Sequence, residues 1–338
     1  MSVKITFGLC AALIALGAVE APAQPLPPTQ PLKLVRLYQG RRAPEDIDRV
    51  SRKIRIGKDG RVSISNVSGD IVVSVSSGDE VSIDATKRGS RGDFDRVRIV
   101  IDDKPGRVDV RTDYSPWRGG NSVSVDYSVS VPADVSLDVY SVSGRVRVDG
   151  VKGSIRLGSV SGNIASTNTP RVEYLRTVSG EIVLGSISHD GTLSASSVSG
   201  NIALNGVKTR TLDLNTVSGE IRLRDAAVEA LTAKSLSGGV EYTGTLVKSG
   251  RYDVNSHSGS VRFALADNPG FELSAGSFSG SIRSDFPMTV GGDSNPNVRF
   301  GRGRGRRGPG DSLQGTYSDG SASLNLRTFS GSIVITKR

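Results

Sequence analysis

One short phrase recurs along the chain and constrains the fold more than any other feature. It reads apolar-x-apolar-x-Ser/Thr-apolar-Ser-Gly-x-apolar and occurs eight times in succession between Leu137 and Ser284. Successive glycines of these phrases lie 18 to 21 residues apart. A fixed period near twenty residues, without helical spacing inside it, indicates a solenoid whose repeats stack on one another. Including two outlying copies, the glycines are Gly69, Gly144, Gly162, Gly180, Gly200, Gly219, Gly238, Gly259, Gly280 and Gly331.

Within each phrase, the alternation of a β-strand runs as far as the Ser/Thr and then changes phase. Leu137, Val139 and Ser141 show the pattern: two apolar positions and one hydroxylated position on the same side, with Glu173 as an exception to the first apolar column. We expect these columns to face inward, and the Ser/Thr column to hydrogen-bond along the stack. The next apolar residue starts a second inward phase, so we expect a corner or bulge between it and the Ser/Thr.

The Ser-Gly step is expected to be a structural turn, with its serine facing solvent. The glycine either adopts a positive φ or lets the backbones of neighbouring coils approach closely. The predicted fold class is therefore all-β, a single-stacked β-solenoid or β-helix with about 18–21 residues per coil. A strand-rich cap is expected at its N-terminal end, and the last phrase is expected to close the far end. Residues 225–234 hint at a helix, but their apolar residues keep the strand register.

The N-terminus has the pattern of a secretory signal peptide. Lys4 precedes an apolar run from Ile5 to Val19, and Ala21-Pro22-Ala23 follows as a cleavage site. We expect export to the periplasm, the cell surface or the extracellular space of a bacterium, with no transmembrane span after cleavage. The single cysteine, Cys10, lies in this leader, so the processed chain is expected to contain no disulfide.

These features predict a domain order. The expected segments are a signal peptide at 1–23, a proline-rich linker at 24–52, an N-terminal β region or cap at 53–136, solenoid repeats at 137–284, a Gly/Arg-rich insertion at 285–323 and a closing strand at 324–338.

The phrases NVSGDIVV, SSGDEVSIDATKRG, VSVPADVSLDVYSVSGRVRV, the serial VSGEI and VSGNI, SGSIRSDFP and LRTFSGSIVI follow one another in this order between Ile54 and Ile335. In this respect the chain resembles a bacterial family named putative adhesins, a domain of unknown function built of β-strand repeats. The resemblance implies an exported, surface-binding protein. It implies no catalytic residues, because none are established for the family.

Chemistry-bearing residues are few. The chain has two histidines: His189 is expected in an exposed turn, and His257, which replaces an apolar residue of the phrase, is expected to be partly buried against the Ser/Thr column. Charges appear scattered at outward positions, without the clusters of a polysaccharide lyase. We therefore predict no catalytic residues, no metal site and no cofactor, and hence a protein that is not an enzyme.

The tract RFGRGRGRRGPG is the sharpest functional hint. Its Arg299, Arg302, Arg304, Arg306 and Arg307 supply five positive charges of a chain whose net charge is +9. Guanidinium groups bind phosphate, sulfate or carboxylate bidentately, although a solvated flexible loop is an equally good interpretation. The favoured function is a non-enzymatic adhesion, scaffold or envelope-interaction module with an envelope or surface partner. The alternatives are a polyanion receptor that uses this tract and, least favoured, a carbohydrate-active enzyme. Intracellular nucleic acid is not expected as a partner, and the oligomeric state is left open.

Overall fold

The structure is a computed structural model that describes residues 46–115, 123–266, 270–289 and 310–338. These residues belong to one compact unit, Pro44–Arg338. Their regular elements are β-strands, apart from one short 3-10 helix, η1 (Arg91–Arg96). Among the described residues, no helix is long and apolar enough to cross a membrane.

The strands before the eight-phrase region are β1 (Asp46–Arg55), β2 (Arg61–Ser68), β3 (Ile71–Val75), β4 (Glu80–Gly89), β5 (Val97–Lys104), β6 (Arg107–Tyr114) and β7 (Ser124–Val131). Those of the region are β8 (Ser136–Ser143), β9 (Val146–Asp149), β10 (Ile155–Ser161), β11 (Ile164–Thr167), β12 (Val172–Ser179), β13 (Ile182–Ser199), β14 (Ile202–Ser218), β15 (Ile221–Ser237), β16 (Val240–Gly244), β17 (Arg251–Ser258), β18 (Val261–Leu265), β19 (Phe271–Ser279) and β20 (Ile282–Ser284). Those after it are β21 (Asp311–Tyr317), β22 (Ala322–Ser330) and β23 (Ile333–Lys337).

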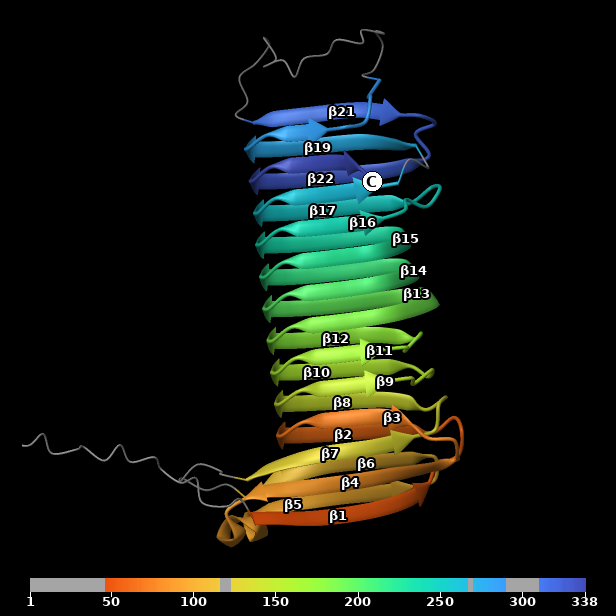
Figure 1. Cartoon of the computed structure of the whole chain (residues 1–338), viewed down its shortest axis with the longest axis vertical. Coiled ribbons are helices and arrows are strands. Elements are labelled where there is room, and N and C mark those ends of the chain that lie inside the picture. The colour runs from red at the N-terminus through yellow and green to blue at the C-terminus, as the bar shows by residue number, and fades with distance from the viewer. Residues whose placement is uncertain (1–45, 116–122, 267–269, 290–309) are drawn as a thin grey trace, which may run out of the picture. The chain divides into compact units, whose positions relative to one another are not determined.

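Most strands belong to two ladders of parallel strands (Figure 1). The first ladder holds the strands that precede the Ser-Gly steps and has β6 at its N-terminal end. In stacking order it is β6, β2, β8, β10, β12, the C-terminal parts of β13, β14 and β15, then β17, β22 and β19. The second ladder is β7, β3, β9, β11, the N-terminal parts of β13, β14 and β15, then β16, β18, β23 and β20.

From the coil β8–β9 to the coil β17–β18, residues one repeat apart pair side by side. Leu157 pairs with Leu175, and Ala195 with Leu214. The two apolar columns and the Ser/Thr column that precede the Ser-Gly steps are buried between the ladders, so each coil supplies a thin slice of one continuous core. The predicted fold class, an all-β solenoid, is therefore confirmed. Residues 225–234 lie in β15 and are strand, as the register indicates.

The stacking order departs from the sequence order near both ends. The early phrase copy, β2–β3, lies between β6–β7 and β8–β9. The late copy, β22–β23, lies between β17–β18 and β19–β20, one coil further in than expected. Antiparallel strands cover the outer coils: β5 and β4–β1 at one end and β21 at the other. Figure 1 shows both insertions, in orange and dark blue.

Two segment boundaries differ from the sequence-based expectation. β1 begins at Asp46, inside the stretch 24–52 expected to be linker, because residues 46–55 pair with β4. β21 lies inside the expected insertion 285–323, where its pairing with β19 makes it part of the stack. The segment 1–23, which the sequence predicts to be a signal peptide, lies outside the described residues.

The glycines of the phrase stack into a column of close backbone approach. A Cβ added at Gly200 would lie 1.9 Å from the carbonyl oxygen of Gly180, and one at Gly280 would lie 2.0 Å from that of Gly331. Only Gly69, Gly144 and Gly238 of this column have a positive φ. The sequence left two reasons for a glycine at this position, close backbone approach and a positive φ. Close approach applies along the whole column, and a positive φ applies at these three positions as well.

The Ser/Thr column is buried, and part of it bonds along the stack. The hydroxyls of Ser256, Ser277 and Thr328 donate to the glycine carbonyl of the adjacent coil at 2.9–3.0 Å, and Thr177 does so at 3.4 Å. Five others, at Ser141, Ser159, Ser197, Thr216 and Ser235, are buried without a partner. Only part of the expected ladder of hydroxyl hydrogen bonds is thus present.

A second column of special backbone geometry lies at the opposite corner, after the strands of the second ladder. One residue in each of five successive coils has a left-handed φ, between 49° and 80°. Pairing of the preceding residues puts all five in register. Gly, Asn and Asp, which tolerate this conformation better than most residues, occupy four of these positions, and a serine occupies the fifth. They are Gly150, Asn168, Ser186, Gly206 and Asp225.

The core is aliphatic in its middle and aromatic toward its ends. Near the C-terminal end, Tyr242 stacks on Phe263 at 5.0 Å between ring centroids, and its hydroxyl donates to the carbonyl of Ala226 at 3.0 Å. At the other end, the buried hydroxyl of Tyr127 lies 2.6 Å from that of Thr112, which donates to Asn66 at 2.9 Å. Buried tyrosine hydroxyls are thus paired, as their desolvation requires.

Candidate functional site

The sequence-predicted arginine site, Arg299 to Arg307, lies outside the described residues. The glycines of the phrase lie at the corner column described above. No group of three or more His, Cys, Asp or Glu side chains that could hold a metal ion occurs within the described ranges. Functional candidates on the described surface are therefore an apolar ridge and a polar depression.

The apolar residue after each Ser/Thr faces solvent, which corrects the expectation that it turns inward. Seven of these side chains expose 40–54% of their surface. The strand alternation continues through this residue, and the chain turns at the Ser-Gly step that follows. The inside of the corner is filled by the closely packed glycine backbones, so no room is left there for a larger side chain. We call this outward row the apolar ridge: Val67, Val142, Val160, Val178, Val198, Val217, Leu236, Phe329 and Phe278, with His257 between Leu236 and Phe329.

Three rings stack at the C-terminal end of the ridge. The imidazole of His257 lies 4.9 Å from the ring of Phe329 at 8°, and Phe329 lies 4.5 Å from Phe278 at 7°. His257 is exposed, whereas we expected it to be partly buried, because it occupies a ridge position and shares that position's outward direction. Since neighbouring rings cover each other's faces, this stack presents mainly ring edges to solvent.

Charged side chains on the first ladder pair across coils. Arg61 contacts Asp138 at 3.0 Å and Arg156 contacts Glu173 at 3.0 Å. Asp190 contacts Arg210 at 2.9 Å. Exposed pairs of this kind contribute only about 0–1 kcal/mol each to stability. They do neutralise charges that the sequence alone suggests are scattered.

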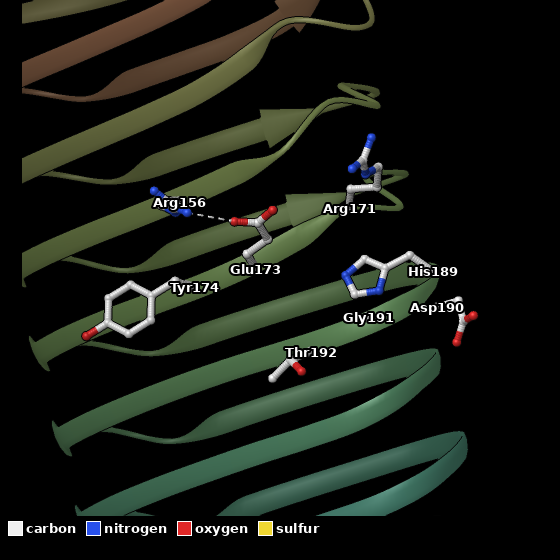
Figure 2. A pocket seen from close by; sticks show the side chains of 8 residues that line it. All are labelled: Arg156, Arg171, Glu173, Tyr174, His189, Asp190, Gly191 and Thr192. Atoms are coloured by element: carbon white, nitrogen blue, oxygen red, sulfur yellow. Dashed lines mark hydrogen bonds and ion pairs between the residues drawn. The ribbon is translucent and has the colours of Figure 1, made fainter.

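A depression of about 650 Å³ lies over β10, β12 and β13, and its lining includes three of these charged groups and one aromatic ring (Figure 2). Its lining residues are Arg156, Arg171, Glu173, Tyr174, His189, Asp190, Gly191 and Thr192.

Two register irregularities meet at this depression. Ile155 pairs with Val172 but Arg156 with Tyr174, so β12 carries one extra residue, Glu173. β13 carries a similar irregularity relative to β14 between His189 and Thr192. Bulges redirect side chains and interrupt a regular surface. They also explain why Glu173 breaks the apolar column: Val172 takes the buried position in its place.

Glu173 is held as a carboxylate. A hydrogen bond with Ser154 and the ion pair with Arg156 hold the pKa of Glu173 below its usual value. A general acid needs the opposite, a carboxyl whose pKa is raised toward the working pH. This residue therefore suits ligand binding rather than proton donation.

His189 lines the depression and is half-buried, whereas the sequence predicts that it lies in an exposed turn. Its Nε2 lies 3.2 Å from the carbonyl oxygen of Val172. Its Nδ1 is buried without a partner beside Gly191, where an added Cβ would lie 3.3 Å away. The bulge at Asp190 and Gly191 tucks the ring against the neighbouring strand. Because a carbonyl oxygen only accepts, Nε2 carries the proton and the lone pair lies on Nδ1. Nδ1 is buried, so a bound ligand could not reach this lone pair for general-base catalysis.

The depression could not be found from the periodic pattern, because its residues occupy different columns of three coils. The available signals were departures from the repeat: Glu173 in an apolar column and the longer spacing between Gly180 and Gly200. Both departures correspond to the bulges.

Residues 174–307 match the model of the Toastrack DUF4097 family. This match confirms, over that segment, the resemblance drawn from the sequence. Solved structures similar to this chain include a putative lipid binding protein from Parabacteroides distasonis (13% identity, 86% of this chain and 97% of that chain, TM-score 0.43). Others are a putative adhesin from Bacteroides fragilis (13%, 85% and 97%, 0.41) and a putative cell adhesion protein from Clostridium sporogenes (10%, 87% and 100%, 0.26). No curated protein matches the chain.

Proposed function

We propose that this chain is an exported, non-enzymatic interaction module of the bacterial envelope or cell surface, adhesin-like in the sense that its long sides bind another component. The apolar ridge is the observation that carries the proposal. It supports binding because apolar side chains are held in water along successive coils, where polar residues would serve the fold equally well.

The size of the ridge makes it more than scattered surface apolarity. With 40–54% of seven Val, Leu and Phe residues exposed, it presents on the order of 500 Å² of apolar surface in one row, which His257 interrupts. That is near the upper end of the patches found on soluble monomers, and such patches commonly mark interaction sites. It would also supply more than half of one partner's share of a standard interface, about 800 Å².

The leader at 1–23 supports export, and the Toastrack match is in keeping with an adhesin-like role. The paired carboxylates and the covered His189 of the depression favour binding over catalysis at that place.

The test places charges on the ridge. In the source bacterium, Val198→Lys with Val217→Lys should release the protein from its envelope fraction and remove its crosslinks to neighbouring components. The matched control is Val183→Lys with Ala203→Lys, which puts the same charges on half-buried apolar positions of the second ladder in the same two strands. Equal release by both pairs, or by neither, contradicts the proposal.

A second candidate, a polyanion receptor, rests on the five arginines between 299 and 307. Deletion of residues 299–307 should then lower the salt concentration needed to elute the protein from immobilised lipopolysaccharide or heparin. Unchanged elution excludes this candidate and leaves the first one standing.

A further inference from the structure

We propose that the depression over β10, β12 and β13 binds an acidic oligosaccharide, with the ring faces of Tyr174 and Tyr140 against sugar rings and Arg171 against a carboxylate. This inference rests on the proposed function, since it names a ligand class for one face of the interaction module. It concerns a different surface from the apolar ridge and uses none of the residues of the arginine tract.

Tyr174 provides an open aromatic face. Its side chain is 41% exposed although it lies on the flat outer side of the ladder. Figure 2 shows its ring broadside to the viewer and away from the other labelled side chains. The face of an aromatic ring carries partial negative charge and packs well against the electropositive C–H groups of a sugar ring. The stacked rings of the ridge, by contrast, have covered faces and could not bind a sugar in this way.

Tyr140 provides a second face on the same side of the ladder. It is 48% exposed, and it pairs with Gly158, where an added Cβ would lie 3.0 Å from the Cδ2 of the tyrosine. The missing side chain at Gly158 therefore lets this ring lie down on the sheet. Gly158 in turn pairs with Arg176, two residues after Tyr174. The two tyrosines are therefore two strand spacings of ~4.8 Å and two residues of ~3.3 Å apart, so their Cα atoms lie about 12 Å from each other. That separation calls for an oligosaccharide rather than a single sugar.

Arg171 supplies the charge that selects an acidic ligand. The other arginine lining the depression, Arg156, is paired with Glu173, and Asp190 is paired with Arg210. Arg171 is exposed and forms no ion pair within 4 Å of a described carboxylate, although its charge helps to lower the pKa of the nearby Glu173. A guanidinium group with both edges available binds a carboxylate bidentately.

The remaining polar groups suit the hydroxyls of a sugar. Thr192 offers a hydroxyl, and the carboxylates of Glu173 and Asp190 are acceptors held in place by their arginines. A few fixed polar groups around an aromatic surface are the usual composition of a small-ligand site. The two bulges that place these groups lie on the neighbouring strands β12 and β13.

The experiment is calorimetric titration of the purified full-length protein with galacturonate oligomers of three to six residues, and in parallel with neutral galactose oligomers of the same lengths. The wild type should bind the acidic series at least about tenfold more tightly than the neutral one. Tyr174→Ala should weaken binding of both series about tenfold, and Tyr174→Phe should retain it. Arg171→Gln should weaken only the acidic series, by about tenfold, and so abolish the preference.

The matched control is Arg147→Gln, an exposed arginine of β9 on the second ladder, which should change affinity less than about twofold. Urea unfolding of each variant checks that the stack is intact. Absence of binding to either series, or equal losses for Arg171→Gln and Arg147→Gln, overturns the inference. Binding lost only on deletion of 299–307 also overturns it and assigns the glycan to the arginine tract. If the inference fails while the ridge variants still release the protein from the envelope, the proposed function stands without it.

Discussion

The glycine column makes a quantitative prediction about stability. In Gly200→Ala, the new Cβ would lie 1.9 Å from the carbonyl oxygen of Gly180, whereas real Cβ contacts stay beyond 3.0 Å. The two coils must therefore separate by about 1.1 Å at this corner. The flanking hydrogen bonds, Gly180 N to Ser199 O at 3.3 Å and Ile182 N to Asn201 O at 2.9 Å, would then lengthen to about 4 Å or more.

Loss of two backbone hydrogen bonds, with local unpacking of the corner, should lower the free energy of unfolding by about 2–4 kcal/mol. For the unit Pro44–Arg338 the midpoint of thermal unfolding should fall by about 3–7 °C. The assay is thermal and urea unfolding followed by far-ultraviolet circular dichroism.

The control is Gly276→Ala, a glycine of β19 whose added Cβ meets nothing within 4 Å and whose φ is not positive. This change should be neutral or stabilise by up to about 1 kcal/mol, because alanine restricts the unfolded chain. Unchanged unfolding of Gly200→Ala, or an equal loss in Gly276→Ala, would refute the assignment of the column to close backbone approach.

Three further predictions concern the second corner, the N-terminal core and the inserted strands. Ser186→Gly should stabilise the protein by about 1 kcal/mol in urea unfolding, because φ is 57° there, while Gly206→Val should destabilise it by about 1–2 kcal/mol. Burial raises the pKa of Tyr127 from 10.0 to about 12. The contribution of the protonated phenol to stability is therefore complete below pH 10 and is lost as the pH rises toward 12. Compared with the wild type, Tyr127→Phe should unfold at a lower urea concentration at pH 8 but should lose less stability when the pH is raised above 10. Truncation after Tyr317 removes β22–β23 and uncovers the edges of both neighbouring coils, so size-exclusion chromatography should show oligomers or aggregates. A monomer that unfolds in urea as cooperatively as the full chain would argue against the inserted position.

Much of the fold was predictable because the repeat reports burial directly. Leu157 and Leu175 pair as the period requires, and the hydroxylated column, including Thr177, is buried. The outward ridge was not predictable from the same logic, because a valine such as Val198 is normally read as core. Its direction depends on how tightly the glycine backbones fill the corner, which the pattern does not encode.

The stacking order and the depression were beyond reach for a different reason. Periodicity gives the distance between equivalent residues but not which coil neighbours which, so the positions of β2–β3 and β22–β23 could not be deduced. The depression depends on the single extra residues at Glu173 and beside His189. The left-handed corner did leave a signal, since Gly150, Asn168 and Ser186 begin a series of turn-forming residues at a constant offset after each strand of the second ladder.

The insertion of β22–β23 between two earlier coils also sets an order of events during folding. While the chain emerges from its N-terminus, β17 and β19 are available before the segment that belongs between them, and these two strands have matching registers with it. Direct pairing of β17 with β19 would form a non-native strand pair, which must break before β22 can insert between them. A factor that delays the docking of residues 271–284 until residue 337 is present would therefore raise the yield of native protein without touching its final stability.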